Sequence, residues 1–243
     1  MQSYIREHTV GGVIRGTFRI YFQNFMTIIV AYLIPVLPFQ LLQVVAMSEE
    51  SGGLLVVSGL GGLIAGLLAV AAITLIISDF CVGNKISIVR VYKRVFGTLI
   101  FKLLATNLLQ MLAIMVGIVL LVIPGFIAIA WFLFSSTIVV LEGTWGAEAL
   151  KRSKQLGGTK HWRNMGVFLI LIAVGAVFGA IVGGISGAMV QNQSDVLGFQ
   201  FVMVIMQQLL FPLTLIAIVL LYYDLRVRKE AYNLEALAED LKF

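Results

Sequence analysis

The sequence predicts an all-α membrane protein, a polytopic transmembrane bundle of about six helices arranged as three hairpins. Composition is the first sign, because 60% of the 243 residues are hydrophobic, only 12% are charged and the mean hydropathy is +1.02. Soluble domains carry about twice that share of charged residues. The second sign is length: the apolar residues form runs of about 20 or more, and a helix of that length crosses the hydrocarbon core of a bilayer.

Six spans are predicted along the chain. They cover residues 25–46, 54–80, 99–122, 125–141, 166–190 and 196–223. The fourth span is short and the "VIPGF" turn before it carries no charge, so a re-entrant hairpin of spans three and four stays open as an alternative. The predicted division is an N-terminal interfacial helix in residues 1–24, a six-span bundle in residues 25–223 and an amphipathic tail in residues 224–243.

The distribution of lysine and arginine predicts the orientation of the bundle. All 17 basic residues lie before the first span, between spans two and three or at the start of span three (Lys102), between spans four and five, or after the sixth span. The other three connections, "MSEESGG", "VIPGF" and "QNQSD", contain none. Basic residues concentrate in cytoplasmic loops, so both termini are predicted to be cytoplasmic.

A degenerate motif precedes each predicted hairpin. The segments "IRGTFRI" (14–20), "VRVYKRV" (89–95) and "LKRSKQL" (150–156) share apolar and basic positions at the same spacing. They predict a threefold repeat in which a basic interfacial helix leads into each hairpin, and ordinary basic flanks of the spans are the alternative. The candidate lipid-facing or partner-facing cations are Arg15, Arg19, Arg90, Lys93, Arg94, Lys151, Arg152 and Lys154.

Small residues recur at every fourth position in two spans. Span five carries Gly175, Gly179, Gly183 and Gly187, and span two carries Ser58, Gly62 and Gly66. Small residues let helix backbones approach closely in lipid, where leucine packing gives no hydrophobic gain. The stripes are therefore interpreted as helix-packing faces within the bundle, against each other or against other spans. Homodimerisation through span five and a channel-lining or hinge role are the alternatives.

Polar residues within the spans are few. Asn107, Gln110 and Gln207 are predicted to form hydrogen bonds between helices, and a polar permeation path through spans three and six is the alternative. The acids nearest to the apolar runs are Asp79, Glu142 and Asp224, at the cytoplasmic ends of spans. Pairing with nearby bases is the expected role of these acids, and a polar vestibule is the alternative.

The sequence contains no motif that carries chemistry. The two histidines have no second metal ligand nearby, and HExxH, CxxC, GxSxG and Walker patterns are missing. No catalytic residue, metal or cofactor is expected, so the protein is not predicted to be an enzyme. Its bases are dispersed beside the spans, which also argues against nucleic-acid binding.

Two stretches carry a resemblance to a known family. Residues 122–164 contain a Pro-Gly turn, a helix, an acid and an "ALKRS" segment, and residues 221–241 form the tail "LYYDLRVRKEAYNLEALAEDL". These stretches resemble bacterial integral membrane proteins labelled glycerophosphoryl diester phosphodiesterase membrane-domain-like, which are loosely similar to YciC-like envelope proteins. The resemblance implies a bacterial cytoplasmic membrane protein, and it transfers no catalytic residue.

The predicted function is a non-enzymatic scaffold or accessory subunit. Its basic cytoplasmic face would engage anionic membrane phospholipid, a partner membrane protein, or both. A transporter or channel for a small or lipid-like solute is the first alternative. A membrane anchor for a separately encoded catalytic partner is the second.

Overall fold

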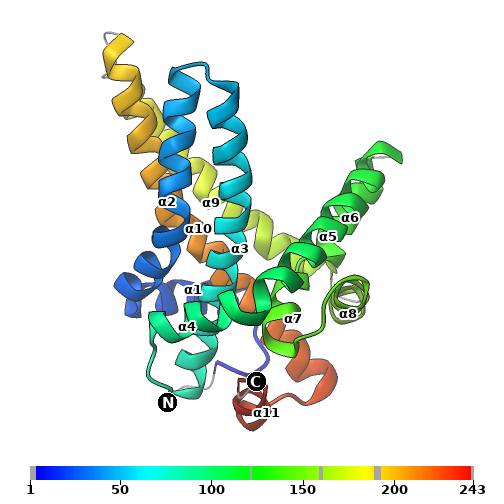
Figure 1. Ribbon diagram of the computed structural model, residues 1–243. Coiled ribbons are helices and arrows are strands. Elements are labelled where there is room, and N and C mark those ends of the chain that lie inside the picture. The colour runs from blue at the N-terminus through cyan, green and yellow to red at the C-terminus, as the bar shows by residue number, and fades with distance from the viewer. Residues whose placement is uncertain (1–3, 121, 159–160, 189–192, 242–243) are drawn as a thin grey trace.

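The computed structural model describes residues 4–120, 122–158, 161–188 and 193–241, and within these ranges the protein is all-α (Figure 1). Six helical stretches are long and apolar enough to cross a membrane, which confirms the predicted fold class. The helices are α1 Val10–Gln23, α2 Phe25–Ser48, α3 Gly52–Val82, α4 Ile88–Arg94, the π-helical turn η1 Val95–Leu99, α5 Ile100–Leu120, α6 Val122–Trp131, α7 Ser135–Glu142, α8 Ala147–Gly157, α9 His161–Ala188, α10 Gln193–Glu230 and α11 Leu234–Asp240.

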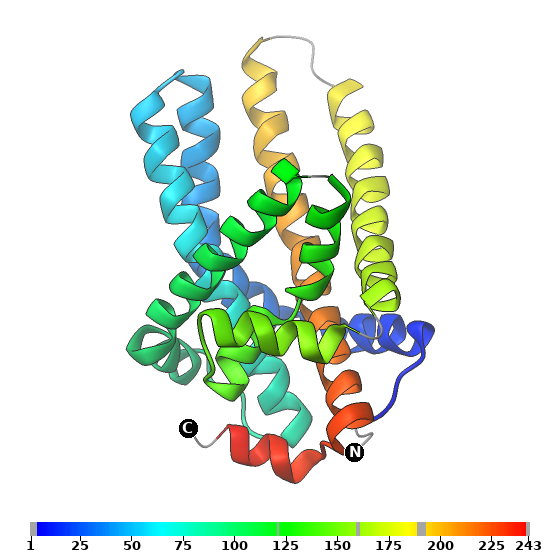
Figure 2. The same ribbon diagram turned by 90° about the vertical axis from the view of Figure 1, so that its right-hand side faces the viewer.

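The long helices form three hairpins, α2–α3, α5–α6 and α9–α10, and each helix packs most extensively against its hairpin partner. A short helix with basic residues precedes each hairpin, namely α1, α4 and α8. The predicted plan of three hairpins with three leading helices is therefore present. Figure 2 shows that the tip of the α5–α6 hairpin stops short of the tips of the other two.

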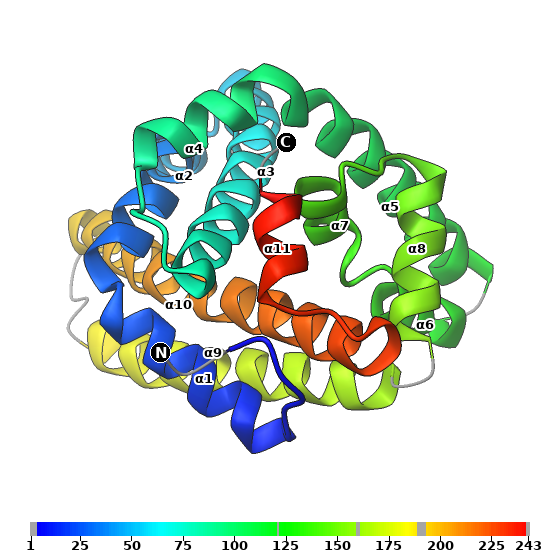
Figure 3. The ribbon, with the colours of Figure 1, turned by 90° about the horizontal axis from the view of Figure 1, so that it is seen from below.

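Both ends of the chain lie at one end of the bundle, together with α1, α4, α8 and α11 (Figure 1). We call this the basic end, and the opposite end, which holds the hairpin tips, the far end. Seen from below, α1, α4 and α8 lie around the rim of the basic end, and α11 crosses its middle (Figure 3). The core of the protein lies near the basic end, where residues 71–78 of α3 and 219–225 of α10 are all buried.

Toward the far end the hairpins expose apolar side chains. Val56, Leu60 and Leu63 of α3 and Val177 and Ile181 of α9 are all exposed. Such surfaces are costly in water and suit contact with lipid tails. Packing between hairpins is thus concentrated at the basic end, and the far half of each hairpin is left to the membrane.

The predicted fourth span is not one continuous helix. Residues 132–134 separate α6 from α7, where the sequence predicts an unbroken helix over 125–141. The Ser153 hydroxyl of α8 donates to the carbonyl of Trp131 at 2.7 Å and accepts the N–H of Phe134 at 3.2 Å. One side chain from α8 therefore satisfies the backbone groups that the break leaves without helical partners.

The other predicted spans agree with α2, α3, α5, α9 and α10 apart from their ends. Helix α10 continues seven residues beyond the predicted end of the bundle at 223, to Glu230. Lys160, Lys242 and the first two residues of the "QNQSD" connection, 191 and 192, lie outside the described residues.

Candidate functional site

A network of charged side chains joins the N-terminal segment, α7, α8, α9, α10 and α11 at the basic end. Its first part surrounds Glu142, the last residue of α7. Its carboxylate accepts hydrogen bonds from Arg152 of α8 at 2.9 Å and from the Tyr222 hydroxyl of α10 at 2.9 Å. Arg152 also pairs with Glu230 at 2.5 Å, and Arg226 pairs with Glu230 at 2.9 Å. The hydrogen bond to Glu230, ahead of the bond to Glu142, holds the pKa of Arg152 above its usual value against the opposing effect of burial.

The second part surrounds Asp224, whose side chain is fully buried in α10. One oxygen accepts the backbone N–H of His8 at 2.6 Å and the Arg228 guanidinium at 2.9 Å. The other oxygen accepts Arg163 of α9. Arg228 also pairs with Glu7 at 2.5 Å. Asp224 therefore ties the N-terminal segment, α9 and α10 together.

The predicted pairing of acids with nearby bases agrees with these positions for Glu142 and Asp224. Arg228 is close in sequence to Asp224, four positions away in α10, whereas Arg152 and Arg163 come from α8 and α9. Asp79 differs, because its carboxylate accepts the side-chain amide of Asn84 at 3.1 Å and forms no ion pair with a described residue.

The eight candidate cations divide into two groups. Arg94 and Arg152 are part-buried, and each contacts another part of the chain. The remaining six are exposed on the three rim helices: Arg15, Arg19, Arg90, Lys93, Lys151 and Lys154. Lys154 lies over the ring of Trp131 at 4.0 Å from its centroid. The basic end thus combines an internal ion-pair network with exposed cations on α1, α4 and α8.

A cavity of about 330 Å³ opens beside this network. Arg94, Lys102, Glu142 and Gly143 are among its lining residues. Lys102 is a residue that the sequence analysis counted only with the loop bases, and the signal that could have found it is a lysine placed just inside an apolar run.

The two stripes of small residues lie on different hairpins. Helix α3 packs mainly against α2, and α9 mainly against α10. Ser58 is buried, whereas a Cβ added at Gly66, Gly175 or Gly179 would meet nothing within 4 Å. A Cβ at Gly183 would lie 3.3 Å from Met203, and those at Gly62 and Gly187 would have only ordinary contacts.

The tightest approaches occur at two glycines outside the stripes. A Cβ at Gly61 would lie 2.1 Å from the Phe39 ring, and one at Gly125 would lie 3.0 Å from the backbone nitrogen of Ile118. Sequence periodicity did not identify Gly61 or Gly125, because neither glycine belongs to one of the repeated stripes of small residues. The "PG" dipeptide at 124–125 is the one local signal that marks Gly125.

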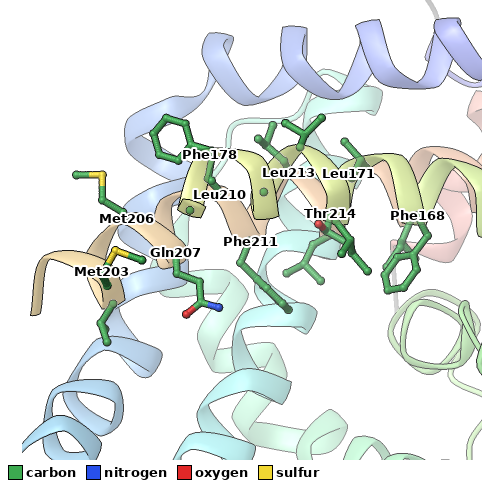
Figure 4. A pocket seen from close by; sticks show the side chains of 17 residues that line it. Phe168, Leu171, Phe178, Met203, Met206, Gln207, Leu210, Phe211, Leu213 and Thr214 are labelled. Carbon is green, nitrogen blue, oxygen red and sulfur yellow. The ribbon is translucent and has the colours of Figure 1, made fainter. Parts of the chain in front are cut away.

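A groove of about 460 Å³ runs between α9 and α10 (Figure 4). Gly175 and Gly179 contribute to its wall, and its lining is apolar except for Gln207 and Thr214. Asn107 and Gln110 lie elsewhere, on α5. The Asn107 amide donates to the Ser136 hydroxyl of α7 at 3.2 Å, and Gln110 accepts the Ser135 hydroxyl. The three polar candidates therefore do not share a cavity in the described part of the chain.

Within the described residues, no three His, Cys, Asp or Glu side chains are grouped so that they could hold a metal ion. The arrangement offers charge–charge contacts, exposed cations and apolar surface. These features suit binding to lipid or to another membrane protein.

Comparison with known proteins places the chain in a family. The family described as "Domain of unknown function (DUF7847)" matches residues 79–225, which runs from the end of α3 into the last part of α10 and covers more than half of the chain. No curated protein and no solved structure matches the chain. The matched region contains the second and third hairpins, α8, Glu142 and Asp224, and the chain belongs to this family of domains of unknown function.

Proposed function

We propose that this protein is a non-enzymatic membrane scaffold or accessory subunit that engages anionic phospholipid through the basic end. The observation that carries the proposal is the division of the cations. The part-buried guanidinium groups of Arg152 and Arg226 serve the internal network, whereas six cations remain exposed on α1, α4 and α8 around the rim.

The physical basis is electrostatic. Each lysine or arginine close to an anionic membrane surface contributes about 1 kcal/mol of attraction. Three short helices that hold their cations at one level would gather anionic lipid around all three hairpins. The contacts of Glu142 and Asp224 hold α8 and the segment that leads into α1 against α10. A partner membrane protein with an acidic face would use the same cations.

The test neutralises four rim cations together, Arg90→Gln, Lys93→Gln, Lys151→Gln and Lys154→Gln. Lipid that surrounds the protein in nanodiscs of mixed phosphatidylglycerol and phosphatidylcholine is then quantified by mass spectrometry. We expect the enrichment of phosphatidylglycerol to fall in this variant and to weaken with salt in the wild type. The matched control exchanges lysine and arginine at the same four positions and should keep the enrichment. Unchanged lipid enrichment and unchanged recovery of co-purifying proteins in the neutral variant would contradict the proposal.

A transporter for a lipid-like solute is the second candidate, and the α9–α10 groove favours it. Gln207 is an exposed polar side chain at that groove. In a Cys81→Ala background, this candidate expects Gln207→Cys to react with a water-soluble thiol reagent. Asn107→Cys should be protected in either case, because Asn107 lies against α7. Protection at both positions would remove the support for transport.

A further inference from the structure

Two part-buried cations at the basic end form no ion pair with any described residue. Six described lysine and arginine residues are part-buried: Arg94, Lys102, Arg152, Arg163, Arg226 and Arg228. The last four form ion pairs with Glu142, Asp224, Glu230, Asp240 or Glu7, whereas Arg94 and Lys102 form none with any described residue. Burying a charge is costly unless it is paired. The two exceptions line the same cavity.

The π-helical turn between the two cations explains why they share a face. Helix α4 continues through η1 into α5, so residues 88–120 form one helical rod. In a regular α-helix, residues eight positions apart point about 80° away from each other. A π turn accommodates about one extra residue, which brings such a pair to within about 20° of the same direction. Insertions of this kind recur at functional sites in helices.

The polar contacts of both cations leave their charge uncompensated. The Arg94 guanidinium donates to the carbonyl of Leu241 at 2.9 Å and to that of Asp240 at 3.5 Å, and the Lys102 ammonium donates to the carbonyl of Gly143 at 3.3 Å. All three acceptors are neutral backbone oxygens. The one acid that lines the cavity is Glu142, and its carboxylate is already engaged by Arg152 and Tyr222.

The electrostatic environment of Arg94 favours the binding of an anion beside it. Burial lowers the pKa of Arg94, and the charge of Asp79 opposes this effect without forming an ion pair. A bound anion would add the stabilisation that Asp79 supplies only from a distance.

The cavity lies at the depth where two spans end. Lys102 is the third residue of α5, and Glu142 is the last residue of α7. Helix α5 exposes Phe101 next to Lys102, and Leu108 and Leu112 further along toward the far end. A lipid with its headgroup at the cavity would therefore find an apolar surface for its acyl chains along the same helix.

We infer that this cavity binds the phosphate of an anionic phospholipid, with Arg94 and Lys102 as the charged donors. This inference rests on the proposed function, because it assigns one specific site within the basic end. Arginine presents a planar fork that suits phosphate, and lysine adds a point charge. A zwitterionic choline headgroup is a poorer occupant, because Glu142 is not available to receive its ammonium.

The test compares two double variants of the full chain that carry the same change in charge. Arg94→Gln with Lys102→Gln removes the cavity cations, and Arg90→Gln with Lys93→Gln removes exposed cations from the same rod. The probe is phosphatidylglycerol, compared with phosphatidylcholine and with inorganic phosphate. Native mass spectrometry counts lipids that survive collisional activation, and thermal unfolding in detergent reports stabilisation by each probe.

We expect the wild type to retain one phosphatidylglycerol under activation and to unfold at a higher temperature when it is added. The Arg90/Lys93 variant should still retain this one lipid, although less phosphatidylglycerol gathers around its rim. The Arg94/Lys102 variant should lose both properties, with binding roughly tenfold weaker for each cation removed. Lys102→Gln alone, which disturbs only the contact to Gly143, should show an intermediate loss if the double variant folds poorly.

Three outcomes would overturn the inference. They are an equal effect of the two double variants, no effect of either, or stabilisation by inorganic phosphate without stabilisation by phosphatidylglycerol. The variant with four neutralised rim cations distinguishes the proposed function from the inference about the cavity. Loss of general lipid enrichment with an unchanged cavity lipid would support the proposed function and the inference independently. An unaffected Arg94/Lys102 variant would remove the inference and leave the proposed function standing.

Discussion

At the scale of single residues, the protein buries a carboxylate inside its membrane-facing bundle and compensates it fully. Asp224 has no exposed side-chain surface, and it receives the His8 N–H together with two guanidinium groups. A pair of this kind contributes little net stability relative to an apolar core, but removal of one partner leaves the others charged and unpaired. Asp224 therefore specifies how the N-terminal segment, α9 and α10 fit together.

The first prediction concerns this carboxylate. We expect Asp224→Asn to lower the free energy of unfolding by about 3 kcal/mol, because Arg163 and Arg228 would then lack their buried counter-charge. Thermal unfolding in detergent measures the change. Asp79→Asn is the matched control, since Asp79 contacts only Asn84 among described partners and should cost less than about 1 kcal/mol. Equal losses at the two positions would contradict the assignment.

The second prediction concerns pH. The Tyr92 hydroxyl of α4 donates to the carbonyl of Ala31, and burial raises the pKa of Tyr92 from 10.0 to about 12. Between these values the unfolded chain releases this proton while the folded chain keeps it, so folding stability falls as pH rises from about 10 to about 12. Below that window the contribution is constant. Tyr92→Phe should show a smaller loss of stability across the window than the wild type, and parallel losses would refute the shift.

At the scale of helices and hairpins, the tight packing at the single glycine Gly125 contrasts with the open surface at the repeated glycines Gly175 and Gly179. Gly175 and Gly179 belong to the regular stripe that the sequence displays, yet their Cβ positions are open and border the α9–α10 groove. Gly125, which stands alone, lies where α5 and α6 are closest to each other. Periodicity identifies a face of a helix, but the neighbour of that face depends on how the hairpins are arranged.

The third prediction follows from this difference. Gly125→Ala should destabilise the protein by about 1–3 kcal/mol, because its Cβ would lie 2.4 Å from the Ile118 side chain and also 3.0 Å from the Ile118 backbone nitrogen, which can move only with helix α5. Gly175→Ala should be neutral or slightly stabilising, since alanine favours the helix and meets nothing there. Unfolding of both variants in mixed micelles provides the comparison. A larger loss for Gly175→Ala would contradict the described packing of α5 on α6.

At the scale of the whole molecule, the three hairpins are unequal. Helix α6 has only 10 residues, which corresponds to about 15 Å of rise, and a break separates it from α7. The α5–α6 tip also stops below the other tips (Figure 2). A hydrocarbon core is about 30 Å thick. These features favour the re-entrant alternative for the second hairpin.

The fourth prediction tests by cysteine labelling whether the second hairpin, α5–α6, crosses the membrane as the first hairpin does. In a Cys81→Ala background, Glu49→Cys in the α2–α3 turn should react with a membrane-impermeant thiol reagent applied at the far side. Val119→Cys near the α5–α6 tip should remain unreactive, because that tip would end within the hydrocarbon region. Both residues are exposed in the protein itself, so protection must come from lipid. Labelling of Val119→Cys from the same side as Glu49→Cys would show a full crossing.

The sequence predicted the helical class, the apolar spans and the three leading basic helices because these depend on local properties. The length of an apolar run and the position of a basic residue are visible without knowing any contact. The break after Trp131 was not visible, because the Ser153 hydroxyl that bonds to two backbone groups there comes from α8. The segregation of basic residues likewise gave no sign that Arg94 and Arg152 contact other parts of the chain while their neighbours are exposed.

Sequence alone therefore determined that the chain is a helical bundle with six apolar spans and basic connections between hairpins. Only the tertiary structure decided that His8 and Asp224, 216 positions apart, meet at one buried carboxylate, and that Arg94 and Lys102 line one cavity without an ion pair to any described residue. The physical reason is that hydrophobicity acts residue by residue along the chain. Charge compensation depends on which helices become neighbours, and that is settled by packing at the basic end.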